Sequence, residues 1–555
     1  MRRLIMIAVA ILIATAAAAC GSSPGSSSSA SGASGTLTLD NETGQEWDCS
    51  FNPFNPSDVG DGIAIGQVYE PLAFVDSLDN AKVTPWLATS WAWSNANKTL
   101  TFTIRKGVKF SDGTPMSAAD VAFTFNMLKK FPDTDLNSVW SVLSSVTQHG
   151  DTVVMDFKSA SVPYFYYIAD QVPIVPESIW SKIANPATYV DSDPIGTGAY
   201  VVNPCSPQAI TYTPNKHYWQ PGEPKIAKVI YPAFTSNNTA NTYLTTDQAQ
   251  WGSQFMPNIN SLYKAKSPNN NYWFPPTANV SLVPNLTVPG LSDVKVRQAM
   301  AYAINRDQVA NVGEYGEERG ANQTDIATPT FSSWKDTAQA ASYGNDYAYD
   351  PAKAKQILES DGYKLGSDGI FAKNGKKLSF TVVNVGGYSD WVADVSVIQS
   401  ELKAVGIAIT PDNLAQTSYD NDLFTGQFQL GVYAQTGGPT PYYELRQWLF
   451  SGNTAPIGKV APTNYERYSN PATDKLLDEY GETTSTATQH QIVDELQNVM
   501  LSQVPFIPVT EESDWFQYDS AAFTGWPSPG NPYAQPAIYD YPDIGQVLLH
   551  LAPKS

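Results

Sequence analysis

The feature that most limits how this chain can fold is its alternation between two apolar spacings. The segment LSFTVVNV, residues 378–385, has the composition of a buried strand. The segment DWVADVSVIQSELKAVG, residues 390–406, has helical spacing and ends at a glycine. Leu100, Phe102 and Ile104 alternate with polar residues, which is typical of a half-buried strand. Strands that alternate with helices form βαβ units, so we expect an α/β fold.

Two helix starts carry their own signals. Ser117 stands three residues before Asp120, a variant of the capping box, and the apolar residues that follow have helical spacing. Asp350 precedes Pro351, which pairs a capping side chain with proline at the first helical position, and Gly362 is placed to end that helix. The sequence therefore predicts helices beginning near residues 118 and 351.

The first residues have the features of an export signal. Two arginines precede the apolar run of residues 4–13, and small residues lead into Cys20. The string AAAAC resembles a bacterial lipobox, although Ala17 stands where leucine is usual. We expect a signal peptide over residues 1–19, a lipid on Cys20, and a flexible Gly/Ser-rich tether over residues 20–36. The alternative is an ordinary signal peptide with a chance cysteine. The remaining sequence has no apolar run long enough to span a membrane.

Charge and composition exclude several functions. The chain has 33 Lys+Arg against 53 Asp+Glu, a net charge of −20, which argues against nucleic acid as a partner. Its 4 His leave little room for imidazole-based metal or acid–base chemistry. A Gly-x-Ser-x-Gly string occurs only at residues 21–25, inside the tether, where no strand precedes it. We therefore expect no enzyme activity and no metal or other cofactor.

Cys49 and Cys205 are the cysteines that remain after the predicted anchor. An exported protein lies where disulfides persist, so we expect these two to pair. The alternative is two separate buried thiols.

The long segment WLATSWAWSNANKTLTFTIRKGVKFSDGTPMSAADVAFTFNML, residues 86–128, resembles the signature region of the family 5 extracellular solute-binding proteins. These are the peptide, nickel and oligosaccharide receptors of ABC importers. Further matching segments follow in the family's order: IGTGAYVV (195–202), NKHYWQPGEPKIAKVIY (215–231), VKVRQAMAYAINRDQVA (294–310), YDPAKAKQILESDGY (349–363), RYSNPATDKLLDEY (467–480) and QVPFIPV (503–509).

The resemblance implies a two-lobe periplasmic-binding-protein fold of type II, with an extra subdomain and a ligand cleft between the lobes. By this resemblance lobe I comprises residues 37–75, 195–285 and 505–555, its extra subdomain residues 76–194, and lobe II residues 286–504. Cys49 and Cys205 would then both lie in lobe I. The resemblance also implies a monomeric receptor that closes on a small-molecule ligand and delivers it to a membrane permease.

The ligand class depends on one segment. Peptide receptors of this family carry an acidic residue in a segment similar to W-x-x-D-Y-x-D-P, whereas here Gln435, Thr436, Gly437 and Gly438 stand at the matching place. The following GPTPYYELR string is similar to the branch that binds cellobiose and related β-linked sugars, as is FNPFNP at residues 51–56. We therefore expect an oligosaccharide ligand.

Aromatic rings can cover the apolar faces of a pyranose while amides bond its hydroxyls. The ligand-binding residues that we predict are Trp47, Asn52, Phe54, Trp251, Asn279, Asn384, Trp391, Gln435, Tyr442 and Tyr443. Weaker candidates are Trp448, Asn55, Gln254 and Asn258. Two other classes stay open. One is an oligopeptide receptor in which another carboxylate, such as Asp420 or Asp422, replaces the missing acid. The other is an enzyme or adhesin on the same scaffold.

Overall fold

The structure is a computed structural model that describes residues 34–40, 46–55, 61–79, 81–435 and 437–554. The predicted signal peptide, the lipidation position Cys20 and nearly all of the tether lie outside these residues. Residues 33–555 form one compact unit. Among the described residues, no helix is both long and apolar enough to cross a bilayer.

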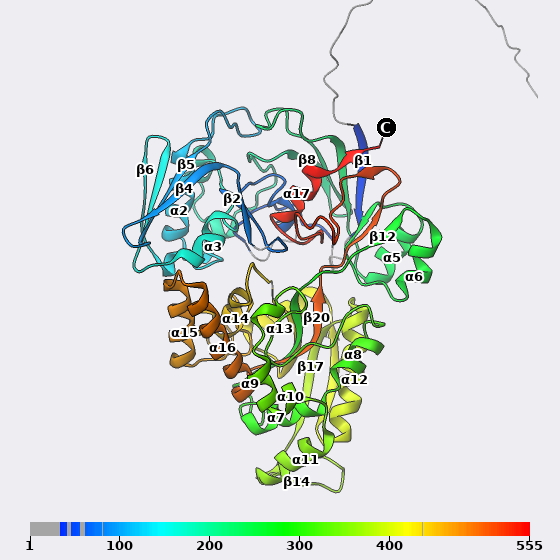
Figure 1. Cartoon of the computed structure of the whole chain (residues 1–555). Coiled ribbons are helices and arrows are strands. Elements are labelled where there is room, and N and C mark those ends of the chain that lie inside the picture. Colours follow the sequence, from blue (N-terminus) through cyan, green and yellow to red (C-terminus); the bar gives the residue numbers. More distant parts are fainter. Residues whose placement is uncertain (1–33, 41–45, 56–60, 80, 436, 555) are drawn as a thin grey trace, which may run out of the picture. The chain divides into compact units, whose positions relative to one another are not determined.

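One large sheet gathers strands from both ends of the chain. Its seven strands have the order β12-β21-β11-β1-β10-β9-β8. β1 (Ser34–Asp40) lies inside the sheet, parallel to both β10 and β11, and its alternate side chains Leu37 and Leu39 are buried. In Figure 1, β1 (blue) lies near the C-terminal segment (red). The other strands are β8 (Tyr200–Ser206), β9 (Ala209–Pro214), β10 (Ile226–Pro232), β11 (Trp251–Gly252), β12 (Asn270–Tyr272) and β21 (Gln517–Asp519).

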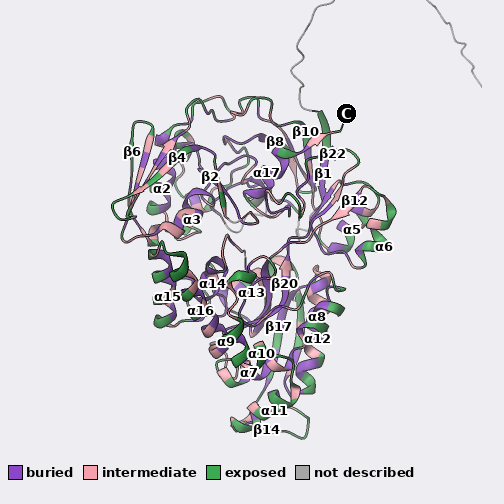
Figure 2. Cartoon of the chain, viewed as in Figure 1, coloured by how far each residue is buried: buried purple, intermediate pink, exposed green. Residues whose placement is uncertain are grey.

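A second sheet has five strands in the order β18-β17-β19-β13-β20. The strands are β13 (Pro276–Pro284), β17 (Ser379–Val385), β18 (Ala408–Leu414), β19 (Leu430–Ala434) and β20 (Ile507–Ser513). β17 and β18 are parallel and are connected by α12 (Ser389–Ala404), which is the predicted βαβ unit. β13 and β20 belong to this sheet, although we assigned residues up to 285 and from 505 to the other lobe. Figure 2 shows buried residues along this sheet and exposed ones on the outer helices, such as α11.

The segment predicted to form an extra subdomain has a sheet of its own. Its four strands, in the order β4-β5-β7-β6, are β4 (Ala88–Ser94), β5 (Thr99–Ile104), β6 (Leu143–His149) and β7 (Thr152–Phe157). The alternation of Leu100, Phe102 and Ile104 is confirmed, because all three are buried in β5.

Both predicted helix starts are also confirmed. α2 (Ala118–Lys130) begins with the reciprocal capping box of Ser117 and Asp120. α11 (Pro351–Ser360) begins after Asp350, whose carboxylate accepts the N–H of Lys353 at 2.8 Å.

The structure contains a Cys49–Cys205 disulfide, the first of the two alternatives considered from the sequence. It connects the segment after β1 to β8 across a sequence separation of 156 residues. A covalent link over so long a loop restricts the unfolded chain strongly.

Two buried arginines fix the path of the chain into β20. Arg297, on α7 (Val294–Ala303), donates from Nε to the Val504 carbonyl at 2.7 Å and from Nη2 to the Gln503 carbonyl at 2.7 Å. Arg306, at the start of α8 (Arg306–Val312), donates from Nε to the Pro508 carbonyl at 2.7 Å. The two guanidinium groups therefore bond backbone carbonyls at the end of the preceding helix and near the start of β20.

Replacing Arg297 with methionine should lower the free energy of unfolding by about 3 kcal/mol, because charged hydrogen bonds are lost and buried carbonyls stay unsatisfied. Denaturant unfolding of residues 33–555 measures the change. Lys295→Met, at an exposed position on the same helix, is the matched control and should change stability by less than about 0.5 kcal/mol. Equal stability of the two variants would contradict the assigned role of Arg297.

Candidate ligand-binding site

Three loops that follow strand ends meet at one cavity. They follow β11 in the large sheet and β17 and β19 in the second sheet, and carboxyl ends of strands are the usual place for ligands in α/β folds. The cavity has a volume of about 270 Å³. We call it the central cavity. Its lining residues include Asn237, Ser253, Gln254, Phe255, Thr277, Tyr388, Asp390, Trp391, Gln435, Gly437, Glu512, Asp514, Trp515, Gln535, Tyr539 and Asp540.

Side chains from the two sheet regions touch at this cavity. Asn237, at the start of α5 (Asn237–Thr245), donates from Nδ2 to Asp390 Oδ1 at 3.1 Å. Asp390 lies in the first turn of α12, beyond the end of β17. The cavity is therefore formed jointly by the two lobes, as a cleft that closes around a ligand requires.

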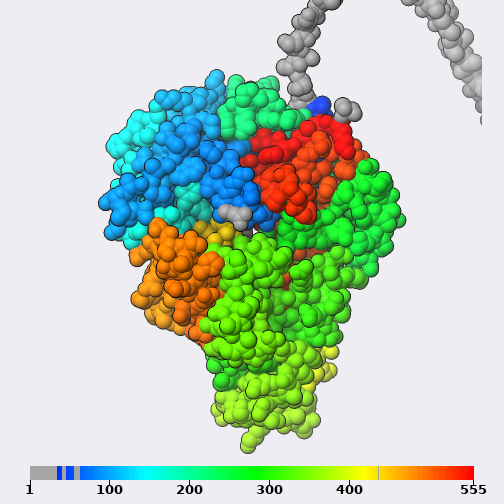
Figure 3. Space-filling model, viewed as in Figure 1, coloured from blue at the N-terminus to red at the C-terminus, as the bar shows by residue number. Residues whose placement is uncertain are grey.

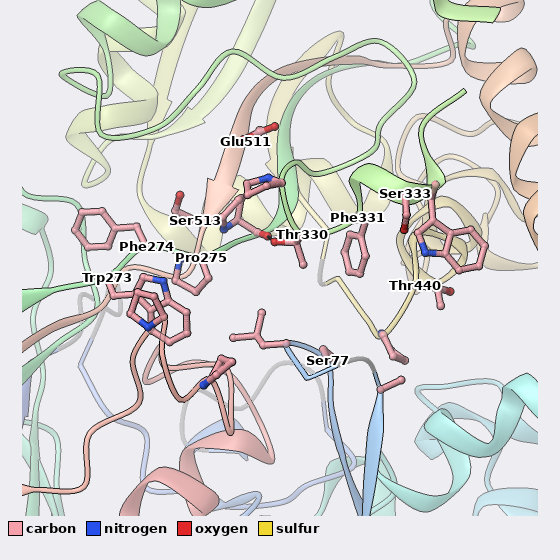
Figure 4. A pocket seen from close by; sticks show the side chains of 18 of the residues that line it. Ser77, Trp273, Phe274, Pro275, Thr330, Phe331, Ser333, Thr440, Glu511 and Ser513 are labelled. Atoms are coloured by element: carbon pink, nitrogen blue, oxygen red, sulfur yellow. Dashed lines mark hydrogen bonds between the residues drawn. The ribbon is translucent and has the colours of Figure 1, made fainter. Parts of the chain in front are cut away.

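β20 separates this cavity from a second one. Glu512 and Asp514 line the central cavity, whereas Glu511 and Ser513 line a cavity of about 770 Å³ that we call the back cavity. Successive side chains of a strand point to opposite faces, so the two cavities lie on opposite sides of β20. The back cavity is also lined by Trp273, Phe274, Pro275, Pro276, Arg319, Thr330, Phe331 and Trp334. Figure 4 shows this cavity, with Ser77 on the side opposite Thr330 and Phe331.

Aromatic rings cover much of the central cavity. Trp391 is half-buried and packs edge-on against Tyr388, with ring centroids 5.2 Å apart. Phe255 packs edge-on against Trp515 at 5.6 Å. Such rings offer flat apolar faces to a ligand.

Carboxyl groups make up the charged part of the lining. Burial, together with neighbouring carboxylates, raises the pKa of Glu512 to about 8. Burial likewise raises the pKa of Asp514 to about 7 and that of Asp390 to about 6. Thr277 donates from Oγ1 to Asp514 Oδ1 at 2.7 Å. No Lys, Arg or His occurs among the described residues that line this cavity. These carboxyl groups can therefore form hydrogen bonds with hydroxyls or pair with a cation, and they disfavour an anionic ligand group in the central cavity.

Two of the predicted ligand-binding residues line the central cavity. Trp391 is one, and the other is Gln435, whose Nε2 is buried without a hydrogen-bond partner. The weaker candidate Gln254 lines it as well. An unpartnered buried amide is costly, and a ligand acceptor would satisfy it.

The other predicted residues are packed in the protein core instead. Trp47 donates from Nε1 to the Tyr231 carbonyl at 3.0 Å, and Trp251 donates from Nε1 to the Pro536 carbonyl at 3.1 Å. Asn52 donates from Nδ2 to the Pro186 carbonyl at 2.8 Å. These side chains and the others of the set are buried, and none lines a cavity described here. The others are Phe54, Asn279, Asn384, Tyr442 and Tyr443.

Local partners explain that burial. Phe54 packs edge-on against Trp180 at 5.4 Å, and Tyr442 stacks on Tyr480 at 3.9 Å. Tyr443 donates from its hydroxyl to the Pro163 carbonyl at 2.6 Å. Asn279 donates from Nδ2 to Asp325 Oδ1 at 3.1 Å. Asn384 Oδ1 accepts the N–H of Val385 at 2.9 Å. The weaker candidate Trp448 is also in the core.

The carboxyl groups of the cavity are the residues that sequence reasoning missed. They come from distant segments, around residues 390, 512–514 and 540. Asp390 had a usable signal, because it directly precedes the predicted Trp391. The suggested substitute Asp420 does not line the cavity and accepts from Gln416 Nε2 at 2.9 Å. Residues 435–438 lack an acid, as the sequence shows, but other segments bring carboxyl groups to the same cavity.

A further cavity of about 410 Å³ is adjacent to the central one, and we call it the side cavity. Gly437, Gln535, Tyr539 and Asp540 line both. The side cavity is also lined by Asn137, Ser138, Tyr166, Tyr167, Gln171, Arg446, Gln447, Asn453, Thr463 and Asp543. Figure 3 shows that the helices of residues 471–503 (orange) meet the blue and cyan part of the chain at the surface. Among the described residues, no cluster of His, Cys, Asp and Glu is arranged to hold a metal ion.

Solved structures of similar proteins have the same fold. A Thermotoga maritima periplasmic oligopeptide-binding protein, solved with mannohexaose bound, is 27% identical with a TM-score of 0.86, and the match covers 94% of this chain and 98% of that one. The Bacillus subtilis oligopeptide-binding protein AppA, solved with a nonapeptide, is 21% identical with a TM-score of 0.79, over 94% and 99% of the two chains.

Curated relatives have diverse ligands in their names. The Escherichia coli nickel-binding periplasmic protein is 26% identical over 80% of this chain and 83% of its own length. A Salmonella choleraesuis glutathione-binding protein is 25% identical over 83% and 87%.

The family model "Bacterial extracellular solute-binding proteins, family 5 Middle" matches residues 82–456, well over half of the chain. The fold, with a cavity between its two lobes, is that of periplasmic binding proteins. This chain belongs to the family 5 extracellular solute-binding proteins, which are receptors and not enzymes.

Proposed function

We propose that this chain is the lipid-anchored, extracytoplasmic receptor of an ABC importer and that it captures a β-linked oligosaccharide in the central cavity. The observation that carries this proposal is the composition of that lining. It combines aromatic rings, amides and carboxyls, and it has no cationic side chain among the described residues. The structural relative solved with mannohexaose supports a sugar ligand.

The chemistry of a pyranose matches these groups. Its C–H faces would lie against Trp391 and Tyr388, and its hydroxyls would bond Gln435, Gln254 and the carboxyls. Gln435 Nε2 would gain the acceptor that it lacks. A ligand that touches both lobes would favour the closed arrangement over the open one.

Anchoring and delivery complete the proposal. A lipid on Cys20 would hold the receptor at the outer face of the membrane, and the tether of residues 20–36 would let it reach the permease. The receptor would act as a monomer, as the resemblance to the family implies.

A peptide ligand is the second candidate, and the carboxyl groups of the central cavity favour it. Asp390, Glu512 and Asp514 together could face the amino terminus of a peptide, and an ammonium group would lower their pKa values again. The glutathione-binding relatives add support.

Calorimetric titration of residues 33–555 with cello-oligosaccharides and with a panel of short peptides tests the ligand class. We expect the sugar to bind and Trp391→Ala to weaken it about tenfold, since a lost aromatic platform costs about 1.4 kcal/mol. Trp334→Ala is the matched control, because Trp334 is also half-buried but lines the back cavity. Peptide binding without sugar binding would make the second candidate correct. If Trp334→Ala weakened binding and Trp391→Ala did not, the ligand would bind in the back cavity and not in the central cavity.

The stability of the protein should fall as the pH rises from about 5.5 to 8.5. The carboxyls of the central cavity have folded-state pKa values raised above those of the unfolded chain, to about 6, 7 and 8. A raised carboxyl pKa contributes stability that is present at low pH and is lost as the pH passes the folded-state value. Thermal unfolding across this range measures the slope.

Glu512→Gln, which imitates the protonated acid, should reduce that slope and raise the melting temperature at pH 8.5. Glu359→Gln, at an exposed position on α11, should leave both unchanged. If Glu512→Gln left the slope unchanged, the pH dependence of stability would not come from the carboxyl groups of the central cavity.

A further inference from the structure

The side cavity is lined by a buried arginine that forms no ion pair with a described residue. Arg446 lies on α14 (Pro441–Leu449) with 4% of its surface exposed, and its Nη2 is buried without a hydrogen-bond partner. Burying an uncompensated charge is costly, so a site that does so is built for a partner that arrives later.

Aromatic rings hold the guanidinium in place. The Cζ atom of Arg446 lies 5.3 Å from the ring centroid of Tyr164, 5.7 Å from that of Tyr167 and 4.8 Å from that of Phe450. Ring faces attract a cation and hold it in place. The guanidinium is therefore positioned while its Nη2 donor, which has no hydrogen-bond partner, stays available to an anion.

The helix that carries Arg446 is itself rigidly packed. Tyr442 stacks on Tyr480, with ring centroids 3.9 Å apart, and Tyr443 bonds the Pro163 carbonyl at 2.6 Å. These contacts attach α14 both to α15 (Pro471–Glu482) and to the segment of residues 76–194. A preorganised donor loses little conformational entropy when a ligand binds.

The nearest acids do not pair directly with Arg446. Asp135 and Asp478 interact with its charge but form no ion pair with it, and the carboxylate of Asp135 accepts the N–H groups of Val139 and Trp140, each at 2.9 Å. Asp540 and Asp543 line the same cavity and accept backbone N–H groups at 3.0 and 2.8 Å. Burial raises the pKa of both well above the usual range, which favours the protonated form of each carboxyl and weakens its repulsion of an anion.

We propose that the ligand carries a carboxylate at one end and that Arg446 binds this group in the side cavity while the rest of the ligand occupies the central cavity. Gly437, Gln535, Tyr539 and Asp540 line both cavities, so the two are adjacent and one extended ligand would reach both. The planar fork of a guanidinium fits the two oxygens of a carboxylate. The remaining lining, with Asn137, Gln447 and Asn453, supplies further polar groups.

This inference rests on the proposed function, and it adds a carboxylate to both candidate ligands, the oligosaccharide and the peptide. In an oligosaccharide the carboxylate would belong to a terminal uronic acid, and in a peptide it would be the carboxyl terminus. The two sources share one chemistry, and matched ligand pairs distinguish them.

The test uses calorimetric titration of residues 33–555 with two matched pairs. One pair is cellobiose and the disaccharide in which its reducing-end glucose is replaced by glucuronic acid. The other is a tripeptide and its C-terminal amide. We expect the acidic member of the pair that binds to bind at least tenfold more tightly than the neutral member, because only the acid offers a carboxylate to the guanidinium.

Arg446→Gln should abolish the preference for the acidic member, and Arg446→Lys should keep part of it. Arg319→Gln, at an exposed position lining the back cavity, is the control and should preserve it. Thermal unfolding of each variant checks the fold. If Arg446→Gln does not fold, the acid preference of the unaltered chain and of Arg446→Lys still decides.

Equal affinity for both members of a binding pair would overturn the inference and leave the proposed function standing. A preference that survives Arg446→Gln would overturn it as well. If neither pair binds in either form, both the inference and the proposed function are wrong.

Discussion

The pairing of β13 with β20 is the interaction on which the rest of the site depends. These strands run antiparallel along the edge of the second sheet, and their ends reach the large sheet region through Pro276 and Ser513. The arginines of α7 and α8 bond the carbonyls that lead into β20 and so fix its register. Because β20 supplies side chains to both neighbouring cavities, its register determines what each cavity contains.

The electrostatics of the site follow from burial more than from net charge. The chain has an excess of acids, yet the carboxyls of the central cavity lie close together with raised pKa values. In the adjacent side cavity, Arg446 forms no ion pair with a described residue, and its Nη2 has no hydrogen-bond partner. Between the two adjacent cavities the lining therefore changes from carboxyl groups to a cation. Such a gradient orients a ligand as well as binding it.

Local signals predicted the regular elements, because periodicity and capping depend on neighbouring residues. β17, α12, the capping box at Ser117 and the helix after Asp350 all followed from such patterns. Trp391 was also within reach, since it follows a strand end that faces a cleft. Periodicity did not reveal that β20 joins the second sheet, because pairing partners far apart in sequence leave no local trace.

The aromatic residues also show that contacts between distant segments cannot be read from local sequence. Trp251 stands at a strand end, like Trp391, but the returning C-terminal segment covers it and accepts its N–H through Pro536. Trp47 is covered in the same way by β10, through the Tyr231 carbonyl. Whether a tryptophan is a platform or a core residue depends on which distant segment packs over it. The carboxyls of the central cavity were missed for the converse reason, since only folding brings them together.

The alternation of side chains along β20 also bears on how such a receptor can change in evolution. Positions 512 and 514 face one cavity, and positions 511 and 513 face the other. A point mutation in this strand can therefore alter one chamber without directly altering the other. Selection for a new nutrient and selection on the opposite surface can proceed independently, although the two chambers share a single wall.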